Sequence, residues 1–197
     1  MEKLSKEREI IKILFKDFLT LHNSRTISKL IGISHAGAFK ILKKLEKRGI
    51  VAPKKIGNTT VYSLNAGNPI ASKEVELALI MEAENFKRWS EDFKELENKV
   101  NFLILFGSIL KNEKEAKDID LLIVAEKKNF KDIEKIIGAR KRISNKKIHP
   151  LIQTSDNFKS DVNKRNKTMI EILKKGIVLF GQEEIRKILC AKRQFSE

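Results

Sequence analysis

A glycine–serine pair and two closely spaced aspartates are the residues of this sequence best suited to chemistry. Gly107-Ser108 follows a hydrophobic run, and Asp118 and Asp120 precede another with one apolar residue between them. A glycine lets the backbone approach a phosphate, and a serine hydroxyl with nearby amides can bind its oxygens. Carboxylate oxygens suit Mg²⁺ or Mn²⁺. Such a site could support phosphoryl or nucleotidyl transfer between oxygen atoms.

The elements around these residues must hold them together. Hydrophobic strands are expected over 101–106 and 119–125. Because residues two apart on a strand point to the same face, both aspartates can reach one cation. The remaining pattern predicts further elements: a helix over 129–142, a strand over 148–154, largely helical residues over 157–175, a short apolar element over 176–181 and a last helix over 183–192.

The stretch LILFGSILKNEKEAKDIDLLIV resembles the nucleotidyltransferase fold of the DNA polymerase β superfamily, especially its small prokaryotic members. That family joins a strand, Gly-Ser, a short spacer and Asp-x-Asp at the head of the next strand; the spacer here has nine residues. The resemblance covers roughly residues 98–190. It implies that Ser108 binds the triphosphate of a nucleotide such as ATP and that Asp118 and Asp120 are metal ligands. Lys111, one turn further on, is a candidate for a phosphate contact.

The same residues also allow a plainer interpretation. An Asp-x-Asp before an apolar strand is often only a polar strand start, here balanced by Lys114 or Lys117. Active members of the superfamily usually carry a third carboxylate on the next strand, whereas this strand reads IHPLIQT. His149 could replace it as a base near neutral pH, or it could be a surface histidine on an edge strand marked by Pro150. Asp156, just past the strand, is another substitute.

The first third of the chain predicts a DNA-binding helix-turn-helix. Apolar spacing indicates helices over 6–21 and 26–31, then Gly32 and a third helix capped by Ser34 and ending at Arg48. A basic hairpin around Gly57-Asn58 follows. Since a helix fits the major groove and a hairpin can reach the backbone, the candidate DNA contacts are Ser34, His35, Phe39, Lys40, Lys43, Lys44, Lys54, Lys55 and Asn58.

The stretches ISKLIGISHAGAFKILKKLEKRGIV and TTVYSLN resemble the winged-helix transcription regulators of archaea and bacteria. This resemblance covers about a third of the chain and implies double-stranded DNA as a partner, although winged helices also serve as protein docking modules. Phe39 stands where such regulators often present a small polar residue. It could contact a thymine methyl group, but we expect it to be buried against Phe15 or Phe18.

The charge of the chain favours polyanionic partners. The formal net charge is +15, and residues 1–70 carry 14 Lys and Arg against 5 Asp and Glu. A lysine-rich surface that serves solubility is the alternative. Cys190 is the sole cysteine, which excludes an intrachain disulfide and a cysteine-based zinc site. No signal peptide and no membrane-spanning run are recognised, so we expect a cytoplasmic protein without a membrane partner.

The expected fold class is α+β, with three segments. Residues 1–68 form a winged-helix domain, 69–97 a linking and packing helix, and 98–197 a nucleotidyltransferase-like domain with a mixed sheet, the boundary lying in the turn-rich residues 65–69. The helix over 70–97 has a heptad-like stripe that includes Val75, Leu79, Trp89 and Phe93. The stripe could join two subunits, but it is expected to pack within its own chain.

Two classes of function remain open. The chain could be a DNA-binding enzyme that transfers a nucleotidyl group from a nucleoside triphosphate to a protein, an RNA or a small molecule. Alternatively, it could be a transcription regulator whose inactive second domain senses a nucleotide or mediates dimerisation. A weaker third hypothesis, an antitoxin-like protein that modifies a partner, comes only from the resemblance to small nucleotidyltransferases.

Overall fold

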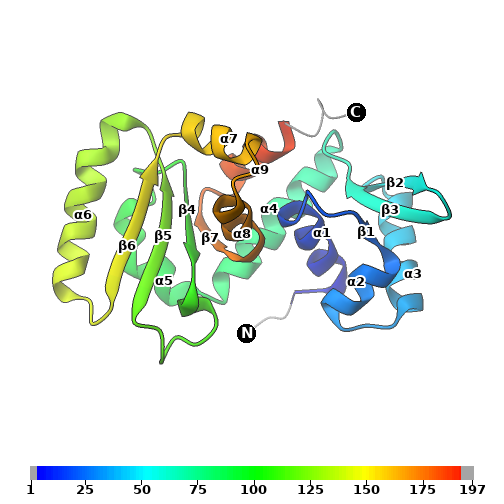
Figure 1. Ribbon diagram of the computed structural model, residues 1–197, viewed down its shortest axis with the longest axis horizontal. Helices are drawn as coiled ribbons and strands as arrows, with labels where there is room; N and C mark the ends of the chain where they lie inside the picture. Colours follow the sequence, from blue (N-terminus) through cyan, green and yellow to red (C-terminus); the bar gives the residue numbers. More distant parts are fainter. Residues whose placement is uncertain (1–3, 192–197) are drawn as a thin grey trace. The chain divides into compact units, whose positions relative to one another are not determined.

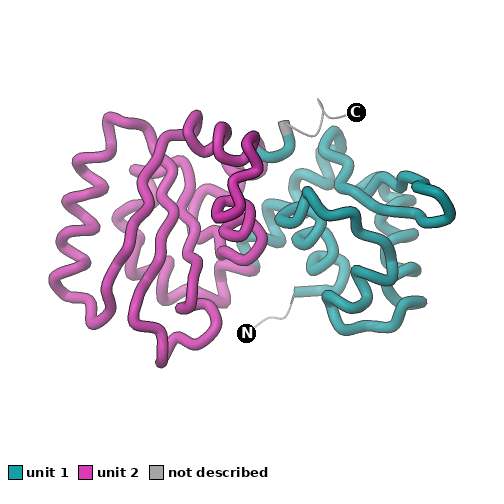
Figure 2. The backbone as a smooth tube through the Cα atoms, viewed as in Figure 1, with its two compact units in different colours: residues 1–81, 189–197 teal, residues 82–188 magenta. Residues whose placement is uncertain are grey.

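Two separate β-sheets organise the chain, one in each of its two structural units (Figures 1 and 2). The computed structural model describes residues 4–191. Within that range unit 1 holds residues up to 81 together with 189–191, and unit 2 holds residues 82–188. The α+β class is confirmed. The predicted end of the last helix, residue 192, lies outside the described residues.

Three helices begin unit 1, and a short polar side chain caps the start of each. They are α1 (Lys6–Lys16), α2 (Ser24–Ile31) and α3 (His35–Lys47). Asn23 and Thr26 form a reciprocal capping box at α2, and the Ser34 side chain accepts the N–H of Gly37 at α3. Gly32, with φ 64°, ends α2 in the left-handed region. The first helix is shorter than the predicted span of 6–21, because residues 17–20 form a turn.

A three-stranded antiparallel sheet completes the winged-helix fold. Its strands are β1 (His22–Asn23), β2 (Val51–Ile56) and β3 (Thr59–Leu64), in the order β1-β3-β2. Ile56 pairs with Thr59, so Gly57-Asn58 forms the two-residue turn of the predicted hairpin. The core beneath it combines apolar side chains of all three helices and the hairpin, including Ile10, Ile27, Leu42 and Val61.

The predicted single helix over 70–97 is wrong, because the helix is interrupted at Asn85 and Phe86. The segment forms α4 (Pro69–Glu84), α5 (Lys87–Asp92) and the 3₁₀ turn η1 (Lys94–Leu96). The amides of Asn85 and Phe86 donate to carbonyls three residues back, which tightens the end of α4. The apolar stripe from Val75 to Leu96 was expected to pack within its own chain. Its apolar side chains are buried there, apart from that of Phe86, which is half-buried.

Unit 2 is built on a four-stranded mixed sheet in the order β6-β5-β4-β7. Its strands are β4 (Phe102–Phe106), β5 (Asp118–Val124), β6 (Lys147–Gln153) and β7 (Ile177–Phe180). Strand β5 runs parallel to β6 and antiparallel to β4. The connection between β5 and β6 contains η3 (Lys127–Asn129) and α6 (Phe130–Ile143). This arrangement places the start of β5 between the end of β4 and the start of β6.

The two faces of this sheet differ. One face carries the main core, in which Leu121 and Ile123 of the sheet pack with Trp89 of α5 and Ile133 of α6. The other face is covered by α7 (Ser155–Asn163) and α8 (Lys167–Lys175) over β4 (Figure 1). Phe102 and Phe158 meet edge to face there, with ring centroids 4.9 Å apart. The starts of β5 and β6 on this second face remain open.

The last part of unit 2 agrees with the prediction that residues 157–175 are largely helical. Helices α7 and α8 occupy this range, and they are separated where Arg165 has a φ of 51° and Asn166 caps α8. Strand β7 confirms the short apolar element, and α9 (Gln182–Ala191) follows. Every helix within residues 4–191 is too short or too polar to span a lipid bilayer.

Candidate functional site

The Gly107-Ser108 turn closes directly onto Asp120. Gly107 follows β4 with a φ of 87°, a conformation that favours glycine. A Cβ atom added to Gly107 would overlap Oδ2 of Asp120. Ser108 opens the 3₁₀ turn η2 (Ser108–Leu110), and its side chain is exposed. The glycine is therefore required here so that the aspartate can lie against the turn.

Asp118 and Asp120 begin β5 and share one face of the sheet. Both are half-buried, while Ile119 between them is buried on the opposite face. Asp120 pairs in register with Phe106, the last residue of β4, which puts it beside the turn. Among the described residues neither aspartate forms an ion pair with a lysine or an arginine. The interpretation in which Lys114 or Lys117 balances these acids is thus not what the structure shows.

His149 joins this cluster from the neighbouring strand. It pairs in register with Asp120 on the parallel strand β6, and its Nδ1 atom lies 3.6 Å from Asp120 Oδ1. Its side chain is 58 % exposed, and β6 is indeed an edge strand. The prediction that Asp156 could substitute for the third carboxylate is wrong. It lies in α7 beyond the far end of β6, and its nearest charged partner is Lys159.

The loop from 111 to 117 is shaped by two residues that the sequence did not single out. The side-chain oxygen of Asn112 accepts the N–H groups of Lys114 and Glu115. The ammonium group of Lys146 donates to the carbonyl oxygen of Ala116 and so ties the loop to the start of β6. In the sequence, only the presence of an asparagine four residues after Ser108 could have predicted the hydrogen bonds of Asn112. Lys111 follows η2 with its side chain exposed.

The donor set fits a cation that is shared with a ligand. The described residues contain no group of three or more His, Cys, Asp or Glu side chains placed to hold a metal ion. Two carboxylates on one strand face are nevertheless what Mg²⁺ commonly uses, together with water and substrate phosphates. The open face beside the Gly107-Ser108 turn leaves those remaining positions to phosphate oxygens. Asp118 and Asp120 thus suit a metal–nucleotide complex better than a metal ion alone.

In unit 1, the exposed side of α3 presents an aromatic ring next to cations. Phe39 is 47 % exposed, so its expected burial against Phe15 or Phe18 is wrong. Phe39 lies on the outer face of α3, and the spacing of the apolar residues in the sequence did not predict this exposure. The Lys43 ammonium lies 5.9 Å from the Phe39 ring centroid. A hydrogen bond to Glu46 raises the pKa of Lys43, so this lysine stays charged.

The other predicted DNA contacts divide into engaged and free side chains. Ser34 caps α3, His35 Nε2 lies 2.8 Å from the Ser24 hydroxyl, and Lys44 pairs with Glu7 of α1 at 2.6 Å. Lys44 therefore lies on a side of the helix that faces its own domain. Among these candidates, Lys40, Lys54 and Lys55 are exposed and form no ion pair with the described residues, and Asn58 is exposed in the turn of the wing.

Sequence reasoning missed Arg25 and Lys29 on α2. Both side chains are exposed, and no ion pair within residues 4–191 involves either of them. Helix α2 packs directly against α3. The spacing of the apolar residues could have predicted that Arg25 and Lys29 are exposed, since Ile27 and Ile31 lie on the buried side of α2.

Comparison with solved structures finds chains of low similarity. The adhesin competence repressor AdcR of Streptococcus pyogenes is 13 % identical, with a TM-score of 0.37 over 70 % of this chain and 79 % of that one. A ZitR variant of Lactococcus lactis is 22 % identical, with a TM-score of 0.33 over 50 % of this chain and 62 % of that one. TM-scores this low assign no function.

Comparison with protein families gives a more specific result. No curated protein matches the chain. Residues 90–185, which contain the turn, both aspartates and His149, match the family model described as "Polymerase beta, Nucleotidyltransferase". That segment lies entirely within unit 2. The chain therefore contains a nucleotidyltransferase-family domain of the polymerase beta type.

Proposed function

We propose that unit 2 binds a nucleoside triphosphate together with Mg²⁺ or Mn²⁺ and transfers a nucleotidyl group to an acceptor. One observation carries the proposal. Two half-buried carboxylates, Asp118 and Asp120, share a sheet face beside the Gly107-Ser108 turn and lack a lysine or arginine partner among the described residues. Partly desolvated carboxylates of this kind gain most from a bound cation.

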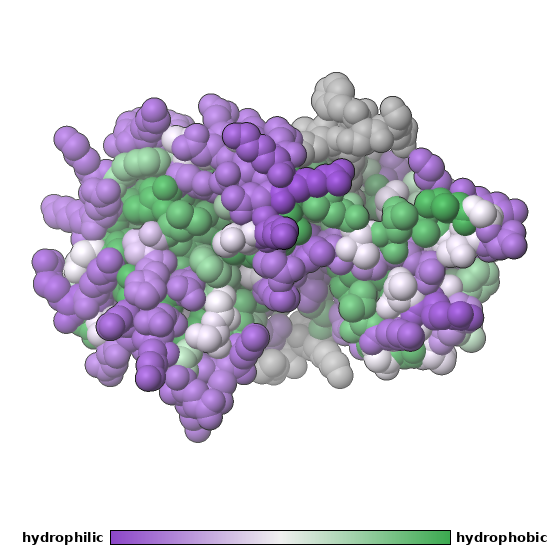
Figure 3. Space-filling view, viewed as in Figure 1, coloured by the Kyte–Doolittle hydropathy of each residue, from purple (hydrophilic) through white to green (hydrophobic). Residues whose placement is uncertain are grey.

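The triphosphate would lie at the turn. The Ser108 hydroxyl and backbone amides of η2 can donate to its oxygens, with Lys111 close enough along the chain to add a positive charge. Apolar side chains are visible over β5 and β6 on this face of the sheet (Figure 3). Leu151, two residues beyond His149 on the same face, is 44 % exposed. It offers apolar surface to the base or ribose.

In the proposed reaction an acceptor hydroxyl on a protein or an RNA attacks the α-phosphorus. A new P–O bond forms, the bond to the β-phosphate oxygen breaks, and pyrophosphate leaves. A bound Mg²⁺ would neutralise the developing charge on the phosphate oxygens. His149 would take the proton of the hydroxyl, a role supported by its exposure and by its position beside Asp120.

A transfer assay tests this proposal. The chain is incubated with each α-³²P-labelled nucleoside triphosphate, Mg²⁺ and a cell extract, and labelled acceptors are separated by electrophoresis. We expect label that disappears in Asp118→Asn and Asp120→Asn, which keep the side-chain shape but lose the charge. Label that persists in both variants would contradict the assignment of the site.

A second function is favoured by one observation, the lack of an acid on β6. If His149 cannot serve as the base, unit 2 would bind the metal–nucleotide complex without transfer and act as a sensor. His149→Ala separates the two functions. It should abolish labelling and leave nucleotide binding intact if the domain is an enzyme, whereas a sensor would show binding but no labelling already in the unchanged protein.

We further propose that unit 1 binds double-stranded DNA through α3 and the wing. The free lysines Lys40, Lys54 and Lys55 can reach phosphates, and exposed Phe39 can contact a thymine methyl group in the major groove. Arg25 and Lys29 of α2 extend the basic surface. The affinity from such contacts falls with salt, because bound counterions are released.

Gel shifts over a salt series test the DNA proposal. Lys40→Ala with Lys54→Ala should reduce the slope of log K against log salt by about 0.9 for each phosphate that the variant no longer binds. Lys73→Ala removes the same kind of charge from α4, where the lysine pairs with Glu76, and should leave the slope unchanged. Equal effects of the α3–wing and α4 variants would show that only net charge matters.

A further inference from the structure

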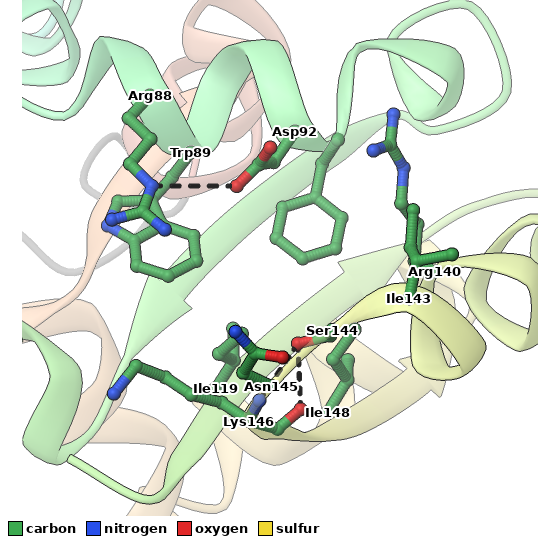
Figure 4. Close-up of a pocket in the computed structure, with 11 residues that line it drawn as sticks. Arg88, Trp89, Asp92, Ile119, Arg140, Ile143, Ser144, Asn145, Lys146 and Ile148 are labelled. Carbon is green, nitrogen blue, oxygen red and sulfur yellow. Dashed lines mark hydrogen bonds and ion pairs between the residues drawn. The ribbon is translucent and has the colours of Figure 1, made fainter.

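The reverse face of the unit 2 sheet carries a pocket that the proposed nucleotide site does not use. Its volume is about 420 Å³, within the range of small-molecule sites. It lies between α5, the end of α6 and the start of β6 (Figure 4). Ile119 and Ile148 line it, whereas their neighbours Asp118, Asp120 and His149 point to the other face. The two sites are therefore separated by the thickness of the sheet.

The interior of this pocket is apolar and aromatic. Trp89 in α5 and Phe93, directly after this helix, are almost fully buried. Ile119 and Ile148 line the side of the pocket that the sheet forms. At its rim, Ile143 is 72 % exposed, the highest fraction among the large apolar side chains of residues 4–191. An exposed isoleucine beside an aromatic interior gains from being covered by an apolar ligand. Size and lining together fit one planar ring system.

The charges around the pocket leave one cation without a carboxylate. Arg88 stacks on Trp89 with 5.0 Å to the ring centroid and pairs with Asp92 and Glu113. Arg140 pairs with Glu95 of the neighbouring turn η1. Lys146, in contrast, donates only to the neutral carbonyl group of Ala116 among the described residues, so its charge is not neutralised.

The residue next to Lys146 strengthens the preference for an anion. Asn145 lines the pocket and is exposed, and its side-chain amide makes no hydrogen bond within the described part of the chain. An amide N–H and an ammonium group together suit a single carboxylate or sulfonate. A triphosphate carries several charges and does not match one free cation.

We propose that this pocket binds a small planar aromatic molecule with one anionic group. The ring would lie against Trp89 and Ile143, and the anion would lie beside Lys146 and Asn145, all four of which line the pocket (Figure 4). The ligand contacts Ile119 and Ile148, which alternate along their strands with Asp118, Asp120 and His149. The site is independent of nucleotide binding and remains even if the proposed transfer reaction fails.

The single tryptophan makes the proposal directly measurable in the full chain. Trp89 is the only tryptophan, so emission excited at long ultraviolet wavelength reports on this pocket alone. The probes are 1-anilinonaphthalene-8-sulfonate, which is aromatic and anionic, and N-phenyl-1-naphthylamine, its neutral counterpart. We expect saturable quenching of Trp89 by both probes, with tighter binding of the sulfonate.

Two variants locate the probe and its charge. Ile143→Asp should weaken both probes at least about tenfold, because it places an acid at an apolar rim; its exposure means that the change should leave the fold intact. Lys146→Met should weaken the sulfonate about fivefold and leave the neutral probe unchanged. Ile70→Asp, an equally drastic change at a 54 % exposed position of α4, is the matched control and should have no effect.

Thermal unfolding by circular dichroism checks that each variant is folded. The proposal is overturned if Trp89 emission does not respond saturably to the sulfonate. It is also overturned if Ile143→Asp binds both probes as tightly as the unchanged protein. Equal weakening of both probes in a folded Lys146→Met variant would refute the anionic part of the assignment.

Discussion

At the scale of single residues, the candidate site depends on a glycine that leaves room for an acid. The sequence predicted that Gly107 permits a close approach to a phosphate. The structure shows that the first group to use this space is the carboxylate of Asp120, which the Cβ of any other residue would displace. The glycine thus positions a candidate metal ligand as well as opening the turn. This role was not visible in the spacing, because strand register determines which residue faces the turn.

The variant Gly107→Ala should therefore lose stability and nucleotide binding together. A positive φ and a steric overlap predict a decrease of about 1–3 kcal/mol in the free energy of unfolding. Chemical denaturation measures it. Gly138→Ala is the matched control: Gly138 lies in α6 with open space for a Cβ, so this change should stabilise the protein by about 0.5–1 kcal/mol. Similar results for both variants would contradict the role given to Gly107.

The single tyrosine offers a second residue-scale test. Tyr62 of β3 is 4 % exposed, and its hydroxyl has no hydrogen-bond partner within residues 4–191. Burial raises the pKa of Tyr62 above its usual value of 10.0. Because the folded pKa is raised, its contribution to stability is complete below the unfolded pKa and is lost as pH rises through the folded pKa.

Ultraviolet absorbance of the tyrosinate form follows this titration. We expect a midpoint above 10.0 for the folded protein and a normal midpoint in denaturant, with stability falling only in that alkaline range. A normal midpoint in the folded state would mean that the wing does not bury Tyr62 in solution.

At the scale of elements, caps and turns were predicted better than long helices. Gly32, Ser34 and Gly57-Asn58 mark boundaries by their own backbone and hydrogen-bonding preferences, and the structure has boundaries at all of them. The break after α4 carries no glycine or proline. The apolar period continues through it because Val75 and Leu79 belong to unit 1, whereas Trp89, Phe93 and Leu96 enter the core of unit 2. A single regular spacing of apolar residues in the sequence thus contributes to the cores of both units.

The cap of α3 gives an element-scale prediction. Ser34→Ala leaves the N–H of Gly37 without its side-chain acceptor and should lower the free energy of unfolding by about 1 kcal/mol. DNA affinity should fall too, since α3 carries Phe39 and Lys40 of the proposed DNA surface. Ser63→Ala, at an exposed position of β3, should change stability by less than about 0.5 kcal/mol. Equilibrium denaturation of both variants makes the comparison, and equal effects would argue against the cap.

At the scale of the whole molecule, the units do not divide where the sequence suggested. The turn at 65–68 is present, but the first unit continues to residue 81. Glu74 of α4 explains this, because it pairs with Arg8 of α1 and Arg48 at the end of α3. Such contacts join residues 26 or more positions apart and leave no trace in local composition. Turn formers predict bends, and only tertiary contacts decide whether a bend separates two cores.

The candidate site was largely predictable, since its residues cluster in one motif. Asp118, Asp120, Gly107 and Ser108 were found by spacing, and the match to residues 90–185 identifies the same segment. His149 and Asp156 could not be separated in the sequence, because both stood near the expected strand. The parallel register of β5 and β6 separates them by placing His149 opposite Asp120.

The central claim is that Asp118 and Asp120 hold a metal–nucleotide complex at the Gly107-Ser108 turn. Isothermal titration of the full chain with nucleoside triphosphates, with Mg²⁺ or with EDTA, tests it most directly. The account predicts binding that requires Mg²⁺ and weakens at least about tenfold in both Asp118→Asn and Asp120→Asn. Binding that is equally tight with EDTA, or that is unchanged in both variants, would contradict it.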